Sequence, residues 1–263
     1  MPTGIGNEVA WWCPSLEDTG NGTLTFYDQI ASGINGSLDN GETGDWVADT
    51  TSGGIRCITL DGTNERGLIV DDNRFTFGNG TTDSAFSVSI WVYATSFAAN
   101  PCVISKAASA TSGEWHMIIG SLGDWLFRCS DLSATAFIGR RTATGSVAIN
   151  TWYNLVATYS GSGAASGIKL YRNGTQVDTL DDNSGTYVAM ENTTQPVTIG
   201  ARGAALYTPG RWDDCRIFDV VVSGANITLL ASARGYQPAS GAFLLLDTPM
   251  MRGGFSPMVW GIS

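Results

Sequence analysis

Catalytic chemistry has few candidate residues in this chain. A retaining glycoside hydrolase needs two carboxyl groups about 5 Å apart, yet no two of the six glutamates fall within one predicted strand. The glutamates are Glu8, Glu17, Glu42, Glu65, Glu114 and Glu191. The only histidine, His116, lies in a predicted strand with no nucleophile motif nearby. We therefore expect no catalytic residues and no enzyme activity, with an atypical glycoside hydrolase built from distant aspartates as an alternative.

Aromatic residues offer a second kind of chemistry, because sugars stack on exposed rings flanked by hydrogen-bonding side chains. The chain holds nine tryptophans and eight tyrosines, enough for such a surface. The candidates for a carbohydrate site are Trp91, Tyr93, Trp115, Trp125 and Tyr207. Core packing is the competing interpretation, since most of these rings fall within predicted strands.

Short antiparallel strands must position these residues. Trp152–Tyr159 and Ile168–Arg172 are predicted as two strands joined by a Gly/Ser/Ala loop. Asn173-Gly174 then predicts a tight turn in which both residues have positive φ. Phe86–Tyr93 alternates strictly, with Phe, Val, Ile and Val facing one way, which is typical of a strand with one face in a core.

Further strands follow from the same signals along the chain. They are expected at 9–14, 23–30, 45–47, 55–60, 67–70, 102–105, 115–119, 125–129, 136–138, 175–180, 197–199 and 212–222. One short helix is expected over Ala225–Arg234, capped by Ser223. So many strands with one helix exclude parallel α/β folds, and the sequence predicts an all-β, antiparallel two-sheet β-sandwich.

Charge and cysteine content narrow the possible partners. The formal net charge of −10 and the pI near 4.4 make nucleic acid and anionic membrane surfaces unexpected partners. Met1–Ala10 shows neither a basic start nor an apolar run, so no secretory signal is predicted, and no stretch is long enough to span a bilayer. The five cysteines form no Cys-x-x-Cys pair, so we expect buried thiols, with a Cys13–Cys215 bridge as the alternative.

Six segments occur in an order typical of one family. They are Ile58–Asn64, Phe86–Val92, Asn150–Tyr159, Leu170–Gly174, Val197–Gly200 and Gly210–Phe218. Over roughly residues 9–235 the chain resembles the laminin-G-like, concanavalin A-like lectin/glucanase superfamily. The resemblance implies a jelly-roll sandwich whose first and last strands are neighbours. The Glu-x-Asp-x-x-Glu strand that serves the hydrolase branch of that superfamily is absent from this sequence.

The resemblance also implies a structural calcium ion. Some relatives use an aspartate of the last strand as a ligand, and Asp213 fits that position, while Asp61 lies in a turn that could contribute. The favoured interpretation is that Asp213 accepts hydrogen bonds from backbone amides and Asp61 caps its turn, because the sequence has no dense oxygen-ligand motif such as an EF-hand loop. No other cofactor is expected.

The last segment breaks the strand pattern. The expected domains are a sandwich over residues 1–235 and an irregular, apolar C-terminal extension over 236–263. The candidate docking residues in this extension are Phe243, Leu244, Leu245, Met250, Met251, Phe255, Met258 and Trp260. A tail packed on its own sandwich is the alternative.

These observations predict a non-catalytic β-sandwich for recognition or structure. The favoured interpretation is a decoration or fibre-type protein of a phage or virus, located at the virion surface or outside the cell. It would dock on capsid or other structural subunits and form a homo-oligomer. The alternative is a carbohydrate-binding or adhesion module that takes glycans, with or without calcium.

Overall fold

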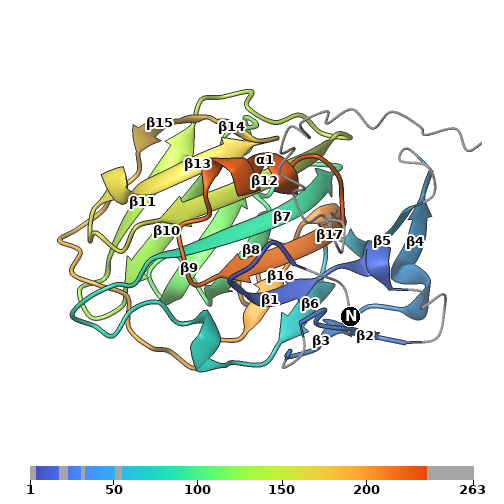
Figure 1. The fold of residues 1–263 in the computed structure, drawn as a ribbon, viewed down its shortest axis with the longest axis horizontal. Helices are drawn as coiled ribbons and strands as arrows, with labels where there is room; N and C mark the ends of the chain where they lie inside the picture. The colour runs from blue at the N-terminus through green and yellow to red at the C-terminus, as the bar shows by residue number, and fades with distance from the viewer. Residues whose placement is uncertain (1–3, 18–22, 31–32, 51–54, 236–263) are drawn as a thin grey trace, which may run out of the picture.

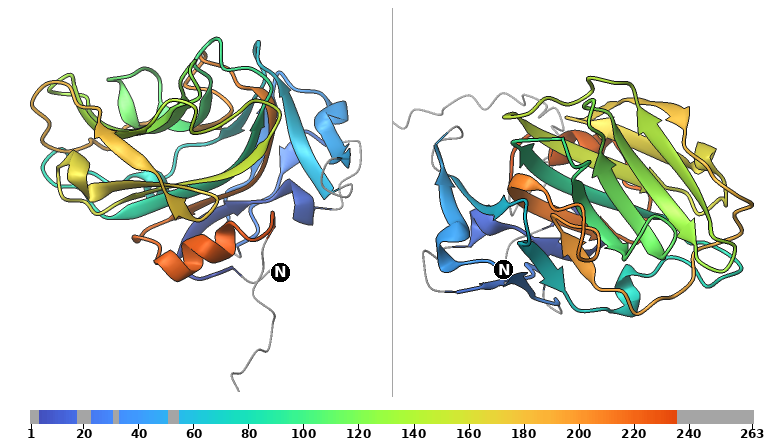
Figure 2. Two further views of the ribbon diagram at one scale, coloured as in Figure 1. Left: turned by 90° about the horizontal axis from the view of Figure 1, so that it is seen from above. Right: turned by 180° about the vertical axis from the view of Figure 1, so that it is seen from behind.

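Two antiparallel sheets stacked face to face make up most of the protein (Figure 1, Figure 2). The computed structural model describes residues 4–17, 23–30, 33–50 and 55–235. Its architecture confirms the all-β, jelly-roll sandwich with one short helix. Among these residues, no helix has the length and apolar character needed to cross a membrane.

The first sheet contains eight strands in the order β14-β13-β12-β7-β17-β5-β4, with β1 also paired to β17. They are β1 (Glu8–Trp12), β4 (Trp46–Asp49), β5 (Ile55–Asp61), β7 (Phe86–Ala94), β12 (Trp152–Tyr159), β13 (Ile168–Arg172), β14 (Thr175–Gln176) and β17 (Pro209–Phe218). The first and last strands are neighbours, as the sequence predicted, since Trp12 pairs with Cys215.

The second sheet contains nine strands in the order β15-β11-β10-β9-β8-β16-β6-β3-β2. They are β2 (Thr25–Phe26), β3 (Gly36–Asp39), β6 (Arg66–Ile69), β8 (Cys102–Ala107), β9 (Gly113–Ile119), β10 (Trp125–Asp131), β11 (Ala136–Thr142), β15 (Asp178–Asp181) and β16 (Val197–Ile199). Short 3₁₀ helices at Pro14–Leu16, Thr43–Asp45, Asn73–Phe75 and Ala165–Gly167 join some of these strands.

The predicted central hairpin is present. β12 pairs with β13 from Leu155↔Arg172 to Tyr159↔Ile168. Asn173 and Gly174 both have positive φ, 49° and 83°, as a type I′ turn requires. On its other side β12 pairs with β7 along all eight of its residues.

The core lies between the sheets and follows the predicted alternation of β7. Phe86, Val88, Ile90 and Val92 all point into it and are at most 3% exposed. Phe86 contacts several other rings, and its ring centroid lies 4.2 Å from that of Phe77 in a stacked arrangement. Burial of these side chains on one face fixes the register of the strand, because a shift by one residue would turn them to solvent.

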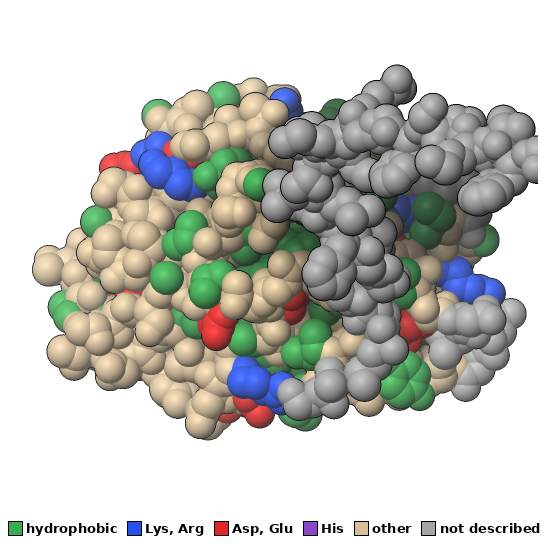
Figure 3. All heavy atoms as spheres, in the orientation of Figure 1, with side chains coloured by type: hydrophobic (Ala, Val, Ile, Leu, Met, Phe, Trp, Pro, Cys, Tyr) green, Lys and Arg blue, Asp and Glu red, His purple; other side chains and the backbone are tan. Residues whose placement is uncertain are grey.

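Helix α1 (Gly224–Leu230) covers the outer face of the eight-stranded sheet (Figure 2, left). Ile227 and Leu230 pack there against Val156 of β12 and Phe218 of β17. The Ser223 hydroxyl accepts a hydrogen bond from Asn226 N–H at 3.3 Å, which confirms the predicted cap. Figure 3 views this face of the molecule, where hydrophobic side chains are scattered among polar groups and no histidine is visible.

The helix ends earlier than predicted. The sequence indicated a C-terminal end at Arg234, but α1 stops at Leu230. The Arg234 side chain lies instead 3.0 Å from Asp49 of β4, and its guanidinium stacks over the Trp152 ring at 4.2 Å. This tertiary contact has no signal in the local sequence.

Candidate functional site

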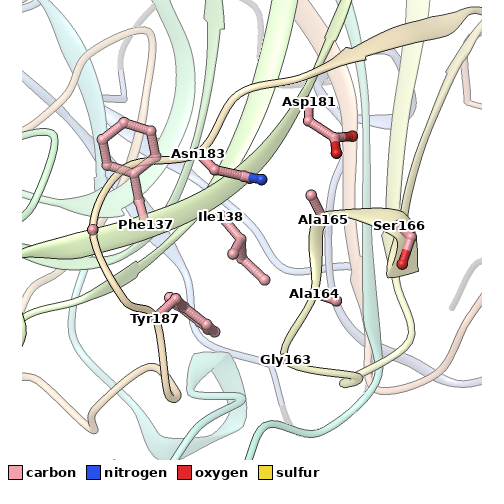
Figure 4. A pocket seen from close by; sticks show the side chains of 10 residues that line it. Phe137, Ile138, Gly163, Ala164, Ala165, Ser166, Asp181, Asn183 and Tyr187 are labelled. Carbon is pink, nitrogen blue, oxygen red and sulfur yellow. The ribbon is translucent and has the colours of Figure 1, made fainter.

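A hollow of about 330 Å³ opens where β11 and β15, at the edge of the nine-stranded sheet, approach the loop that follows β12 (Figure 4). Its lining combines aromatic rings, hydrogen-bonding side chains and exposed backbone. The lining residues are Phe137, Ile138, Gly163, Ala164, Ala165, Ser166, Asp181, Asn183, Gly185 and Tyr187.

The polar groups of one wall come from the end of β15. Asp181 Oδ1 accepts a short hydrogen bond from Arg140, whose guanidinium also lies 2.6 Å from Asp178. Asn183 Oδ1 accepts a hydrogen bond from Gly139 N–H at 3.1 Å, so its amide nitrogen is left to face the hollow (Figure 4). This wall therefore presents a carboxylate acceptor beside an amide donor, both held in place by neighbours.

The opposite wall is the glycine-rich loop that the sequence predicted after β12. Gly161 and Gly163 have φ of 76° and 68°, conformations that side chains other than glycine rarely adopt. Gly163 N–H donates to the Tyr159 hydroxyl at 2.8 Å. The loop then forms the 3₁₀ turn that carries Ser166, an exposed residue at the rim of the hollow (Figure 4).

An anchored tyrosine forms the inner end of the hollow. The Tyr187 hydroxyl donates to Asp83 Oδ2 at 2.6 Å, and the Tyr159 hydroxyl donates to the same oxygen at 2.7 Å. Met190 N–H donates to the other Asp83 oxygen at 2.9 Å. Burial and the nearby acidic groups raise the pKa of Tyr187, so its hydroxyl stays protonated and the ring is fixed.

Phe137 of β11 turns its ring to the outer face of the sheet, away from the other lining side chains (Figure 4). The guanidinium of Arg128 lies over its ring, 4.1 Å from the centroid. Arg128 is itself paired with Asp182 at 2.6 Å. The ring is therefore held between its strand and a fixed cation, in a geometry that favours cation–π attraction.

This arrangement suits a polyhydroxyl ligand. A carboxylate and an amide nitrogen face the hollow, a serine lies at its rim, and the ring of Tyr187 supplies an apolar surface. Only one carboxyl group, that of Asp181, is among the lining residues. A second hollow of about 380 Å³, beside Val9 and Phe77, likewise has one lining carboxyl, Asp219.

The structure separates the five aromatic residues that the sequence offered as a sugar platform. Trp115 and Trp125 are fully buried in the core, so their prediction as stacking residues is wrong. Both side chains alternate onto the core face of the nine-stranded sheet, and Trp115 Nε1–H donates to Phe75 O at 3.0 Å. An exposed ring is what stacking on a sugar requires.

The other three aromatic residues are half-buried and lie apart from the hollow. Trp91 donates its indole N–H to Leu230 O at 3.1 Å, beneath α1. Tyr93 packs against Trp152 at a centroid distance of 5.7 Å. Tyr207 lies in the loop between β16 and β17.

Asp61 and Asp213 are not brought together as a calcium site. Asp61 is opposite Pro209, four residues before Asp213 on β17, which is about 13 Å along a strand. Asp61 caps its turn by accepting from Thr63 N–H at 2.7 Å. Desolvation is the largest single effect and raises the pKa of Asp61, but the hydrogen bonds from Thr63, Asn64 and Glu65 together lower it below its ordinary value. Within the residues that the structure describes, no group of three or more acidic, cysteine or histidine side chains is arranged to hold a metal.

Asp213 has the structural role that the sequence favoured over calcium binding. It is fully buried and accepts hydrogen bonds from Ser15 N–H at 3.1 Å and Asp214 N–H at 2.8 Å. It sits at a bulge where β17 exchanges β5 for β1 as its neighbour. Burial, reinforced by the Asp214 carboxylate, raises the pKa of Asp213 to about 7.

Two other predictions concern the cysteines and the C-terminal extension. All five cysteines are buried free thiols, so the prediction of buried thiols is confirmed and the Cys13–Cys215 bridge is not formed.

The proposed docking residues Phe243, Leu244, Leu245, Met250, Met251, Phe255, Met258 and Trp260 lie outside the described residues.

Sequence reasoning missed the residues that line the hollow. Asp181-Asp182 was noticeable only as an acidic pair, and Ser166 only as part of a loop. Asn183 and Tyr187 carry no motif that distinguishes them from turn residues. A turn sequence rich in Asp, Asn, Ser and Gly beside a sheet edge is the one signal that was available.

The chain matches a family model described as the concanavalin A-like lectin/glucanases superfamily over residues 70–228. No curated protein is similar enough in sequence to match. One similar solved structure is domain 4 of AbnA, an extracellular arabinanase of Geobacillus stearothermophilus, in complex with arabinotriose. The TM-score is 0.56 at 15% identity, covering 86% of this chain and 98% of that one.

Toxin domains are also similar in structure. The binding domain of Paraclostridial Mosquitocidal Protein 1 has a TM-score of 0.57 at 15% identity, over 86% of this chain and 52% of that one. The ligand-binding domain of botulinum neurotoxin serotype D, in complex with N-acetylneuraminic acid, has a TM-score of 0.55 at 14% identity, over 86% and 50%. The chain therefore spans about half the length of these toxin domains, and the likeness concerns the fold.

Proposed function

Because this chain belongs to the concanavalin A-like lectin/glucanases superfamily, we propose that it is a lectin-like module that binds carbohydrate without cleaving it. The observation that carries the proposal is the hollow between Asp181, Asn183 and Ser166. Its acceptor and donors match the hydroxyl groups of a sugar, and Tyr187 gives an apolar surface for the C–H face of the ring.

Pre-organisation supports binding at this place. Asp181 is fixed by Arg140, Asn183 by Gly139, and Tyr187 by Asp83. Little side-chain entropy would be lost when a ligand is bound, which favours affinity.

The distribution of carboxyl groups supports a binding role over hydrolysis. Hydrolysis of a glycoside by the usual mechanisms needs two carboxyl groups flanking the bond. The hollow brings one carboxyl, Asp181, to the ligand, and the second hollow also brings one, Asp219. Similar folds in an arabinanase domain with arabinotriose and a toxin domain with N-acetylneuraminic acid are consistent with glycan binding.

The expectation of a virion decoration or fibre protein depended in part on the apolar extension 236–263, which lies outside the described residues. It stays a prediction, and so does docking on capsid subunits or on copies of the chain. Carbohydrate binding is preferred because described residues carry it.

A glycan array with the full chain, with calcium and with a chelator, tests the proposal. We then expect Asn183→Ala and Asp181→Ala to weaken the best ligand roughly 10- to 100-fold, the effect of losing one or two polar contacts. Asp219→Ala is the matched control, since it removes the carboxyl of the other hollow. If binding survives Asn183→Ala and Asp181→Ala but is lost with Asp219→Ala, the glycan binds in the second hollow and the proposed site is wrong. If the chain binds no glycan at all, the proposed function is refuted.

A further inference from the structure

His116 is the only histidine of the chain, and it is fully buried on the outer face of the nine-stranded sheet. Trp115 and Met117, its neighbours in β9, point into the core, so His116 points the other way. In the strand register it lies between Ser105 of β8 and Arg128 of β10. The outer face of an antiparallel sheet meets water unless another part of the chain covers it.

The loop between β16 and β17, residues 200–208, provides this cover. Ser105 Oγ–H, which is opposite His116 in the register, donates to Ala201 O in the loop at 2.9 Å. The Leu206 side chain packs against three buried residues of the sheet, namely Cys102, Ile118 and Leu126. One of the three is two positions after His116 in β9, on the same face. The loop therefore shields the imidazole ring from water.

Hydrogen bonds hold the loop closed. Thr208 N–H donates to Gly200 O at 2.8 Å, which closes the base of the loop. Cys102 N–H of β8 donates to Leu206 O at 2.8 Å, and Thr208 Oγ1–H donates to Cys102 O at 2.7 Å. Releasing the loop from β8 breaks the bonds to Cys102 and requires no separation of the two sheets.

The groups around the His116 ring leave it without a partner for a positive charge. Among the described residues, neither of its ring nitrogens has a hydrogen-bond partner. Arg128 is directly opposite in β10, where cross-strand Cβ atoms are about 5 Å apart. Arg202 brings a second guanidinium close to the ring from the loop. A proton on His116 would therefore add a third positive charge in a place that water does not reach.

The acidic groups nearby are already engaged. Glu114, two residues before His116 in β9, is paired with a buried lysine at 2.7 Å. Asp182 is paired with Arg128 at 2.6 Å. The thiol of Cys102 stays protonated, because burial raises its pKa to about 12. In the closed loop, these groups do not offset a charge on the imidazole.

Closing the loop changes the affinity of His116 for a proton. Desolvation lowers the pKa of His116 well below its ordinary value, and the guanidinium groups of Arg202 and Arg128 lower it further. When the loop is open, water reaches the ring and its pKa returns toward about 6.5. The closed form therefore loses stability relative to the open form as the pH falls below about 6.5. The loss stops growing once the pH is below the lowered pKa of the closed form.

We propose that the loop 200–208 is an acid-sensitive cover, which leaves the sheet when His116 takes up a proton. Because one proton is bound on opening, the ratio of open to closed form rises up to about tenfold for each pH unit below about 6.5. The open form exposes the apolar residues that Leu206 covers, on the same face as the guanidinium of Arg128. This inference does not depend on the proposed carbohydrate-binding function.

Amide hydrogen exchange of the full chain, followed by NMR between pH 7 and pH 5, tests the proposal. The amides of Cys102 and Thr208 report on the loop, since their hydrogen bonds hold it closed. After correction for the intrinsic exchange rate at each pH, their protection should fall up to about tenfold per pH unit below about 6.5. The amides of β12, in the middle of the other sheet, should stay more strongly protected at every pH.

Three variants separate the histidine from other causes. His116→Gln removes the titrating group, so the protection of the loop should no longer depend on pH. Arg202→Gln keeps the histidine but removes one cation that opposes its protonation, so the loss of protection in acid should be smaller. Lys169→Gln is the matched control, because it removes the same charge from a half-buried position on β13 of the other sheet and should behave as the wild type does.

Two other buried groups titrate in the same range but with the opposite sign. Burial raises the pKa of Asp213 to about 7 and that of Glu17 to about 8, so both stabilise the folded chain as the pH falls. A protection of the loop that stays constant from pH 7 to pH 5 would therefore overturn the inference. A loss that persists in His116→Gln would also overturn it, as would an equal loss in the loop and in β12, which would mean that the whole sandwich unfolds.

Discussion

Replacing Lys106 with methionine should destabilise the sandwich strongly. Lys106 is fully buried, and its Nζ lies 2.7 Å from Glu114 Oε1 and 2.7 Å from Asp71 Oδ1. It also donates to the carbonyl oxygens of Thr193 and Gln195, each at 3.0 Å. The substitution removes the one cation that pairs with Glu114 among the described residues, and the Glu114 side chain is itself fully buried.

The size of the effect follows from the burial of both partners. Removing one member of a buried ion pair costs about 3–5 kcal/mol, because the other charge is left without compensation. For a chain of this length, about 2–4 °C of melting temperature is lost per kcal/mol. We therefore expect Lys106→Met to melt roughly 10 °C below the wild type at pH 7.

The pH dependence of this effect has a defined sign. Burial already raises the pKa of Glu114 above its ordinary value, although Lys106 opposes the rise. Without Lys106 the pKa of Glu114 rises further, so the folded variant takes up a proton as the pH falls. The penalty is then fully present above this raised pKa and shrinks as the pH falls toward the pKa of the unfolded chain.

Urea and thermal unfolding of Lys106→Met, Glu114→Gln and the double variant measure the coupling. The double variant should be more stable than the sum of the single losses predicts, since neither charge is left alone. Lys169→Met, at a half-buried position, is the control and should change the free energy of unfolding by less than about 0.5 kcal/mol. Additive losses, or a wild-type midpoint for Lys106→Met, would refute the reasoning.

Three further predictions concern other buried groups. Burial raises the pKa of Glu17 to about 8, so ionisation of Glu17 lowers the stability of the fold as the pH rises from about 4.5 to 8. In urea unfolding, Glu17→Gln should have the same free energy of unfolding as the wild type at pH 4.5 and be more stable, on the order of 4 kcal/mol, above pH 8. Trp115→Ala should lower the free energy of unfolding by about 3–5 kcal/mol, because it leaves a cavity in the core and removes the hydrogen bond to the Phe75 carbonyl. An unchanged melting temperature would contradict the burial of Trp115. The five buried cysteines should react with a thiol reagent only after unfolding. Burial also raises the pKa of Cys102 to about 12, which keeps its thiol protonated. A rapid reaction of the native protein would contradict the burial of these thiols.

Local signals explain why the strands could be predicted. The turn at Asn173-Gly174 depends on the conformational freedom of two residues, and the strand Phe86–Ala94 on an alternation visible in the sequence. The Ser223 cap depends on a hydroxyl one position before the helix. Each of these features is decided within a few residues, so the sequence alone indicates it.

The exposure of the aromatic rings could not be predicted in the same way. Trp91 and Trp115 both occur in strands, but one lies beneath a helix on an outer face and the other in the core. A strand has two faces, and its own residues do not reveal which of them the second sheet covers. The choice between core packing and sugar stacking therefore stayed open until the sheets were placed.

The sequence by itself determined the fold class, most strands and their hairpin, the acidic character of the protein and its likeness to a lectin family. Only the tertiary structure decided where the candidate site lies. Ser166 and Tyr187 line one hollow although about 20 residues separate them, and the Arg234 guanidinium stacks over the Trp152 ring across a still longer interval of chain. Contacts of this kind depend on the pairing of distant strands, for which no local pattern of residues carries the information.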